Sequence, residues 1–396
     1  MTFTAGDARP EALRSIARAR RTRKKENCIM YRERIAFLDW LRVAACFMVM
    51  AIHSAEPFYL GGEAPDVTFV ASRGDALWIT VVECICRTCV PLFAIASSYL
   101  LFPVRRPAGE FFRRRFLRVG VPFLAWAAAY VWMADGSWGK MCFNFPDEGG
   151  HLWFVPMIAG LYILMPLLSP WAEKVGKKEL SLWICAWLFT TLFPFARLLW
   201  TRLYGAPSFG AVPYLWGECP WNGFGAFHYI SGFAGYMMIG LWFRKFGRDL
   251  SWARTLSVAV PLLLAGAAIM GTAFFGALSR HGFPLSKDYA YAVVSETGIE
   301  YNSTGVALAT IGAFMVLRKF EFKGAFYRFA VKPVSEASYG MYLMHMFFLT
   351  PFSEAFKPAM STPLCIAATA ACSFAASAAV AVAARKIPLA GKWICG

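Results

Sequence analysis

LDWLRVAACFMVMAIHS, residues 38–54, is the stretch that decides the fold of this chain. Its length and apolar character predict a membrane-spanning helix, yet it carries Asp39, Arg42 and His53. Charges inside the hydrocarbon layer are costly, so such side chains usually face a protein interior or a wet cavity. Arg42 and His53 are eleven residues apart, which places both on one face of the helix, roughly 16 Å apart along its axis. Asp39 precedes Arg42 by three residues, close enough to pair with it.

The pattern therefore predicts a helix that lines a polar cavity. For His53 taken alone, the alternative is an interfacial histidine without a chemical role. A second charged residue on the same face, Arg42, favours the cavity over that alternative.

The composition indicates a polytopic membrane protein. Of 396 residues, 58% are hydrophobic and only 16% are charged, which is too apolar for a soluble chain of this length. The net charge of +16 would suggest nucleic acid binding in a soluble protein. Here the excess of basic residues follows from the positive-inside rule, so we expect no nucleic acid partner. The 11 cysteines lie mostly in apolar runs and predict no disulfide framework.

Apolar runs of spanning length recur along the chain and predict an all-α fold with about ten transmembrane helices enclosing a polar cavity. The expected spans are 36–54, 77–102, 116–134, 152–170, 181–200, 225–243, 255–277, 301–318, 336–352 and 361–383.

The basic residues alternate between the loops on the two sides of the predicted bundle. Most of the 40 lysines and arginines fall on one side, together with both termini. This asymmetry predicts a multi-pass protein of the plasma (inner) membrane with both termini in the cytoplasm. The basic residues expected on the outer side are few: Arg73, Lys140, Arg202, Arg280, Lys287 and Lys357.

Residues 1–34 are polar and strongly basic, and no apolar segment of a cleavable signal peptide precedes Phe37. We expect a disordered cytoplasmic tail at the anionic membrane surface, followed by one transmembrane domain over 35–390. Met30 is an alternative start of the chain, because the regular pattern begins just after it.

Glu83 and Arg87 lie four residues apart in the second predicted span, at about the depth of His53. This spacing allows an ion pair on one helix face. Either the pair is buried for structure alone, or Arg87 faces the same cavity as His53.

The loop after the second span ends in a cluster that includes Arg114, Arg115 and Arg118. A stop signal of the positive-inside kind explains part of this cluster. Arg115 and Arg118 are also one helical turn apart, and guanidinium groups bind phosphate in a bidentate manner. They therefore predict a site for a ligand with several phosphates, such as coenzyme A, that enters from the cytoplasm.

The predicted outer loops are rich in glycine, proline and aromatic residues. His151-Leu-Trp153-Phe opens the fourth span, and the run from Trp221 to His228 opens the sixth. Aromatic residues at this level are either ordinary interface residues or surfaces on which a sugar ring stacks. Two cysteines of these loops would form a disulfide only if they are close in an oxidising compartment. The remaining polar candidates are Cys142 and Cys219 for that disulfide, and Glu296, Glu300 and Asn302 at the outer edge of the eighth span.

The ninth span carries a polar stripe at helical spacing, formed by Ser338, Tyr342 and His345. Hydrogen bonding between helices is the alternative to ligand binding for this stripe. Cys84, Cys86 and Cys89 share one predicted helix, but no neighbouring residue completes a metal-ligand set, so we interpret them as small apolar side chains.

These motifs together resemble those of the acyltransferase 3 family of integral membrane acyltransferases. The resemblance runs over about residues 35–385 and is carried by an ordered set of motifs, of which each is weak and the whole is specific. Ser98 stands at the small-residue position of the family's usual Ser-Gly-Tyr. We expect a stand-alone membrane enzyme without the family's common fused extracytoplasmic hydrolase-like domain. The motifs are Leu38-Asp-Trp-Leu-Arg42, the Arg42 to His53 spacing, Arg87 to Tyr99, Arg115 with Arg118, His151-Leu-Trp-Phe154 and Ser338 to His345.

Within the family, the chain is most similar to short O-acetyltransferases that decorate surface polysaccharides, including those of enterobacterial common antigen. The resemblance implies acetyl-CoA as the donor substrate, with no permanently bound cofactor and no metal. The phosphates of acetyl-CoA would lie near Arg114, Arg115 and Arg118. The acceptor would be a glycan or a lipid-linked sugar, and membrane lipids would surround the protein.

The resemblance also implies that His53, Arg42 and Asp39 are the catalytic residues, with His53 as the catalytic histidine and Arg42 organising the cavity or the acyl donor. Two chemistries stay open. His53 acts either as general base on a sugar hydroxyl or as a nucleophile that carries the acetyl group to an acceptor outside. Glu83, Arg87, His151, Trp153, Tyr342 and His345 are the expected cavity or substrate residues.

Two other classes of function are compatible with polar residues inside spans. A transporter or flippase without chemistry would use such residues equally well, although the chain shows no duplicated halves. A membrane scaffold or sensor would leave Arg42, His53 and Arg87 unexplained.

Overall fold

The structure is a computed structural model that describes residues 34–59, 70–133, 139, 150–204, 227–280, 282–284, 298–388 and 390–396. Over these ranges the regular structure is helical, without strands. The protein is therefore an all-α polytopic membrane protein, as the sequence predicts. Seven segments of the described chain are long and apolar enough to cross a membrane: Ala36–Phe58, Arg73–Leu101, Ala108–Met133, Gly150–Lys174, Lys177–Arg197, Trp252–Ser279 and Thr362–Ala384.

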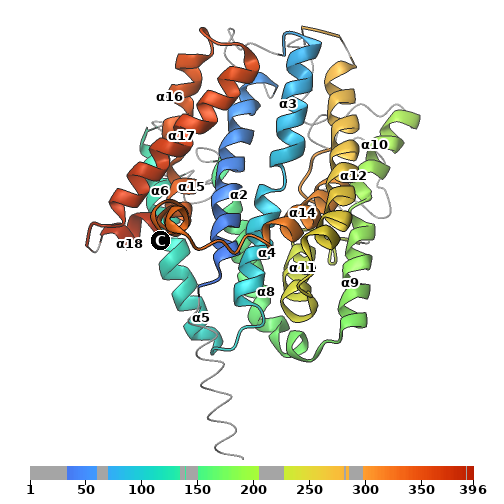
Figure 1. Ribbon diagram of the computed structural model, residues 1–396, viewed down its shortest axis with the longest axis vertical. Coiled ribbons are helices and arrows are strands. Elements are labelled where there is room, and N and C mark those ends of the chain that lie inside the picture. Colours follow the sequence, from blue (N-terminus) through green and yellow to red (C-terminus); the bar gives the residue numbers. More distant parts are fainter. Residues whose placement is uncertain are drawn as a thin grey trace, which may run out of the picture. The chain divides into compact units, whose positions relative to one another are not determined.

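Several of these segments consist of more than one helix, joined at a break or a change of helix type (Figure 1). The described α-helices are α2 (Ala36–Ala55), α3 (Arg73–Cys86), α4 (Cys89–Leu101), α5 (Ala108–Arg115), α6 (Val121–Met133), α8 (Phe154–Lys174), α9 (Lys177–Thr190), α10 (Phe193–Tyr204), α11 (Ala234–Phe246), α12 (Trp252–Ser279), α14 (Thr304–Leu317), α15 (Lys332–Met344), α16 (Met346–Phe356), α17 (Thr362–Ala384) and α18 (Ala390–Cys395). Short 3-10 or π turns are η1 (Glu56–Phe58), η2 (Phe116–Gly120), η3 (Gly150–Trp153) and η6 (Tyr327–Val331).

The other three predicted spans take a shorter or broken form. The span predicted at 225–243 contains α11, of 13 residues, and the span at 301–318 contains α14, of 14 residues. The span at 336–352 is divided into α15 and α16 at His345. Shortened helices leave non-helical backbone at membrane depth, which is tolerated where that backbone is buried in protein or lines a cavity.

α2 is buried on more than one side. Leu41 and Ala45 belong to a core with residues of α4, α11 and α14. Cys46 and Met50 belong to another core with residues of α15 and α17. A helix surrounded in this way is positioned as a rigid unit, and Figure 1 shows it between the blue α3 and the orange and red C-terminal helices.

The first turn of α2 fixes the segment that follows α14. Asp39 is 1% exposed and accepts hydrogen bonds from the Tyr327 hydroxyl (2.6 Å) and the Ser335 hydroxyl (2.7 Å). Trp40 Nε1 donates to the Phe322 carbonyl at 3.2 Å. Asp39 and Trp40, in the first turn of α2, therefore connect this helix to the segment that contains η6 and α15.

Two pairs of helices approach so closely that only glycine fits. A Cβ atom on Gly266 of α12 would lie 2.5 Å from the Gly305 carbonyl oxygen of α14. A Cβ atom on Gly240 of α11 would lie 2.7 Å from the Ile95 carbonyl oxygen of α4. Small residues of this kind bring helix backbones together in membranes, where packing and not hydrophobic exclusion holds helices to one another.

Basic side chains close the C-terminal ends of several helices. Arg244 donates to the carbonyls of Tyr99, Leu100 and Phe102 at the end of α4, at 3.0–3.2 Å. Lys245 donates to the Ala172 and Val175 carbonyls at the end of α8, at 2.8 and 2.9 Å. Arg318 donates to the Gly247 carbonyl after α11 at 2.7 Å. The last four carbonyls of a helix lack intrahelical donors, and cations there also complement the helix dipole.

Some sequence predictions fall on residues outside the described ranges. They are the basic tail up to residue 33, Lys140 and Lys287 of the predicted outer side, the Cys142–Cys219 pairing, Glu296, and residues 221–226 of the run from Trp221 to His228.

Candidate active site

A cavity of about 370 Å³ lies at the C-terminal end of α2. It is formed where α2 and η1 meet α4, η3, α15 and the non-helical residues before α14. Its size is within the range of small-molecule binding sites. It is lined by Val49, Ile52, His53, Glu56, Arg87, Cys89, Val90, His151, Trp153, Phe154, Phe233, Glu300, Tyr301, Asn302 and Tyr342.

His53 faces this cavity with its Nδ1 atom 2.5 Å from Glu56 Oε2. The chain changes from α2 to the 3-10 turn η1 at Glu56, with Pro57 in the first turn. This change keeps the carboxylate on the side of His53. A carboxylate at Nδ1 favours the tautomer with the proton on that atom, which leaves Nε2 as an acceptor.

Two more histidines stand beside His53. The ring of His345 lies 5.1 Å from the ring of His53 and 5.2 Å from the ring of His151, between centroids. His345 is fully buried behind the cavity wall, where its Nδ1–H donates to the Tyr342 carbonyl at 2.6 Å. His345 Nε2 and His151 Nε2 are buried without a hydrogen-bond partner. For His345 the unpaired Nε2 is an acceptor, because its Nδ1 carries the proton, and a buried acceptor without a partner is costly.

The predicted pair of Glu83 and Arg87 is present, with 3.3 Å between Arg87 Nη1 and Glu83 Oε2. Glu83 also accepts a hydrogen bond from the Tyr59 hydroxyl at 3.0 Å. Arg87 lies at the break between α3 and α4, where its Nε donates to the Ile299 carbonyl at 3.1 Å. Arg87 lines the cavity, and Glu83 supports it from behind.

Another part of the cavity wall is aromatic and polar. The Trp153 ring lies 5.4 Å from the Tyr301 ring and 6.0 Å from the Phe233 ring. The Arg87 guanidinium carbon lies over the Tyr301 ring, 5.0 Å from the ring centroid. The neighbouring Asn302 Oδ1 is buried without a hydrogen-bond partner. A flat aromatic wall beside unpaired acceptors suits a ring that carries hydroxyl groups.

Tyr342 joins the polar stripe of α15 to this cavity. Its hydroxyl donates to the His151 carbonyl at 2.7 Å, and its ring lines the cavity. Ser338, by contrast, donates to the Ser335 carbonyl of its own helix at 2.9 Å. The stripe therefore serves two purposes, contact between segments at Tyr342 and hydrogen bonding within the helix at Ser338.

Asp39 and Arg42 lie elsewhere, near the opposite end of α2. Their side chains are 3.5 Å apart, and neither lines the histidine cavity. The structure thus places the two ends of the Arg42–His53 motif at different sites, roughly 16 Å apart along one helix.

Of the three arginines predicted to bind phosphate, none lines the histidine cavity. Arg114 pairs with Glu110 at 2.8 Å. Arg118 is exposed in the π turn η2. Arg115 is half-buried over the Tyr162 ring, 5.8 Å from its centroid, and its Nε is buried without a hydrogen-bond partner.

Two tyrosines of α15 stack in sequence towards the histidines. The Tyr339 ring stacks with the Tyr342 ring at 6.4 Å, and the Tyr342 ring stacks with the His345 ring at 5.9 Å.

Several site residues are not predicted by the sequence patterns. Glu56 is the most consequential, and its position three residues after His53 is the signal that would have found it. Tyr301 and Phe233 come together only in the folded chain. Cys89 lines the cavity as a free thiol. In the described part of the chain, no group of three His, Cys, Asp or Glu side chains is arranged to hold a metal ion.

Comparison with known proteins identifies the family. The model of the acyltransferase 3 family, an acyltransferase domain, matches residues 35–383. No curated protein and no solved structure matches the sequence. The matched range contains every helix that contributes to the histidine cavity. This chain therefore belongs to the acyltransferase 3 family and is a membrane acyltransferase.

Proposed function

We propose that the protein is an O-acetyltransferase of the plasma membrane. It transfers acetyl from acetyl-CoA to a sugar hydroxyl of a cell-surface polysaccharide or of its lipid-linked precursor. The observation that carries this proposal is the contact of His53 with Glu56, inside a cavity whose wall is partly aromatic.

The contact gives His53 the arrangement of a general base. With its Nδ1 proton held by the Glu56 carboxylate, Nε2 is free to take the proton of an acceptor hydroxyl. The hydroxyl oxygen then forms a bond to the thioester carbonyl carbon. The carbon–sulfur bond breaks, and the CoA thiolate leaves and takes up the proton.

Arg87 supplies positive charge at the same cavity. The tetrahedral intermediate of acyl transfer carries negative charge on the former carbonyl oxygen, and a fixed cation nearby stabilises it. Glu83, Tyr59 and the Ile299 carbonyl hold the arginine in place, so that little reorganisation is needed when the charge develops.

The donor is proposed to bind by its phosphates at Arg115 and Arg118, on the basic side assigned to the cytoplasm. The partly buried Arg115 guanidinium and its unpaired Nε support this assignment. Arg114 contributes less, because Glu110 already neutralises it.

The acceptor is proposed to bind at Trp153 and Tyr301, with Asn302 receiving a hydroxyl hydrogen bond. The alternative mechanism, in which Nε2 of His53 becomes acetylated and passes the group on, uses the same geometry. The two differ in whether the acetyl group ever becomes attached to the protein.

The test is thiol release from acetyl-CoA by purified protein in detergent, with and without a surface-glycan extract. His53→Ala is compared with wild type and with His228→Ala, an exposed histidine outside the cavity. We expect acceptor-dependent release that persists in the His228 variant and disappears in the His53 variant. Acid quenching without acceptor, using acetyl-labelled donor, separates the mechanisms, because only the relay leaves label on wild-type protein.

Two outcomes contradict the proposal. Thiol release absent with every extract, together with intact binding of a sugar-lipid, would indicate a transporter that uses the cavity without chemistry. Equal release from all three proteins would remove His53 from the reaction.

A further inference from the structure

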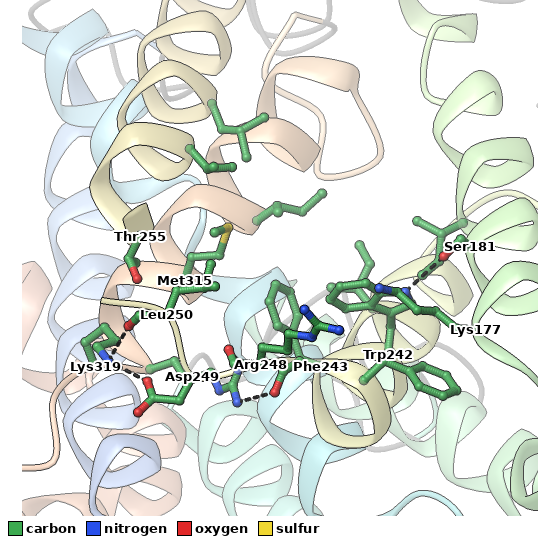
Figure 2. Close-up of a pocket in the computed structure, with 18 of the residues that line it drawn as sticks. Lys177, Ser181, Trp242, Phe243, Arg248, Asp249, Leu250, Thr255, Met315 and Lys319 are labelled. Atoms are coloured by element: carbon green, nitrogen blue, oxygen red, sulfur yellow. Dashed lines mark hydrogen bonds and ion pairs between the residues drawn. The ribbon is translucent and has the colours of Figure 1, made fainter. Parts of the chain in front are cut away.

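A second cavity, of about 460 Å³, lies between α9, α11, α12 and α14 (Figure 2). Figure 2 shows Lys177 and Ser181 of α9 on one side of it and Thr255 and Lys319 on the other. Trp242 and Phe243 of α11 lie between these sides. We call this cavity the basic-end groove.

The basic-end groove is separate from the histidine cavity. α11 leads from Phe233, which lines the histidine cavity, to Phe246, which lines the groove. Ile239 already lines the groove, so the two cavities begin roughly 9 Å apart along α11. α14 is arranged in the same way. Asn302, before the helix, lines the histidine cavity, and Arg318, after the helix, lines the groove. The groove therefore extends from the middle of these helices towards their other end, and none of its lining residues lines the histidine cavity.

The body of the groove is apolar and open to the side. Its floor includes the buried Ile239 and Phe243, and its edge on α12 includes Val258, which is 46% exposed. In a membrane protein an exposed apolar edge of this kind faces hydrocarbon. The groove thus accepts an apolar chain that enters from the lipid phase.

The mouth of the groove is charged, and part of that charge is internally satisfied. Lys319 pairs with Asp249 at 2.5 Å and holds the pKa of that carboxyl below its usual range. The Arg318 guanidinium donates to the Gly247 and Arg248 carbonyls.

Two cations of the mouth have no such partner. The Lys177 and Arg248 side chains are exposed, and neither makes an ion pair with any residue in the described ranges. Lys177 lies over the Trp242 ring, 5.4 Å from its centroid. It is also the first residue of α9, so the positive end of that helix dipole lies at the same mouth. Together these groups attract an anion immediately beside an apolar groove.

We propose that the basic-end groove binds an anionic phospholipid, with one acyl chain in the groove and the phosphate between Lys177 and Arg248. The complementarity of charge and polarity favours this occupant. The headgroup of a zwitterionic lipid would place its own cation beside Lys177 and Arg248, which repel it. Phosphatidylglycerol has no cation and carries a net negative charge. Basic pockets between transmembrane helices bind anionic headgroups in this manner.

The test is native mass spectrometry of full-length purified protein, titrated with phosphatidylglycerol or with phosphatidylcholine of the same chains. Wild type is expected to retain phosphatidylglycerol in preference. The Lys177→Gln/Arg248→Gln double variant is expected to weaken retention of phosphatidylglycerol by roughly 25-fold, about fivefold for each charge, and to leave phosphatidylcholine unchanged.

A second pair of variants tests the apolar part. Val258→Trp fills the groove and is expected to remove binding of both lipids. Val260→Trp changes a similarly exposed residue, 41% against 46%, that does not line the groove, and binding should persist. Lys178→Gln is the matched control for the charge, because Lys178 is exposed on the same helix and lies outside the groove.

The proposal is overturned if the two lipids bind wild type equally, or if Val258→Trp and Val260→Trp behave alike. It is also overturned if a polyprenyl phosphate displaces phosphatidylglycerol at equal concentration, because the groove would then belong to a lipid-linked sugar. Loss of thiol release does not enter this test, so it stays independent of the proposed reaction.

Discussion

Glu56 Oε2 lies 2.5 Å from His53 Nδ1, one helical turn further along the chain and at the point where α2 becomes a 3-10 turn. The relationship is local, yet it gives the cavity its one histidine that is bonded to a carboxylate among the described residues. In this bond to a carboxylate His53 differs from His151 and His345, whose rings are nearby and whose Nε2 atoms have no hydrogen-bond partner.

Glu56→Gln should therefore reduce catalysis without removing the donor or the acceptor. An amide presents either an NH₂ or an oxygen to Nδ1 and no longer stabilises the imidazolium that forms in the reaction. We expect kcat to fall by about 10²–10⁴-fold, with little change in either KM. Glu56→Asp should recover part of the rate. A rise in KM with unchanged kcat would instead assign Glu56 to substrate binding.

Arg115→Gln should act on the donor alone. We expect KM for acetyl-CoA to rise about tenfold, because the charge-assisted bond to phosphate is lost, while KM for the acceptor stays the same. Arg114→Gln is the matched control and should change KM by less than about twofold, since Glu110 already pairs with that residue. Identical kinetics of the two variants would place the phosphates elsewhere.

Asp39→Asn should lower stability more than turnover. The buried Asp39 carboxylate accepts two hydroxyl hydrogen bonds and pairs with Arg42, so that neutralising it costs about 3 kcal/mol. We expect a clear drop in the thermal unfolding temperature in detergent, and a specific activity within about fivefold of wild type for the folded fraction. Glu110→Gln, which breaks exposed ion pairs, should shift the unfolding temperature little. A folded Asp39→Asn protein without activity would show a direct role in chemistry.

Gly266→Ala should separate α12 from α14. The added Cβ atom would lie 2.5 Å from the Gly305 carbonyl oxygen, and relief of this overlap costs about 1–3 kcal/mol. Gly276→Ala on the same helix meets no atom within 4 Å and should be neutral or slightly stabilising. Thermal unfolding of the two variants side by side measures the difference. Equal unfolding temperatures would mean that the two helices do not pack as described.

Sequence patterns predict the features that the geometry of a single helix determines. Helices follow from apolar runs, and the Glu83–Arg87 pair follows from a spacing of four residues on one helix. The Asp39–Arg42 pair is found on the same basis. Each of these relationships needs only the pitch of a helix, which does not depend on the rest of the fold.

The assembly of the cavity needs more than pitch. Tyr301 and Asn302 reach it because α14 begins late and leaves non-helical backbone at that depth, whereas an apolar run predicts a span that starts at 301. His345 falls behind the wall because α15 ends there. Breaks of this kind depend on what the freed carbonyls and amides meet in neighbouring segments, and hydropathy does not contain that information.

The cations that close the ends of α4 and α8 have a consequence for biogenesis. Arg244 and Lys245 are translated well over 60 residues after the carbonyls that they bind, which belong to segments ending at Phe102 and Val175. Until α11 emerges from the ribosome and inserts, those two earlier helices have open C-terminal ends. The ends of α4 and α8 are therefore completed only when this later segment arrives.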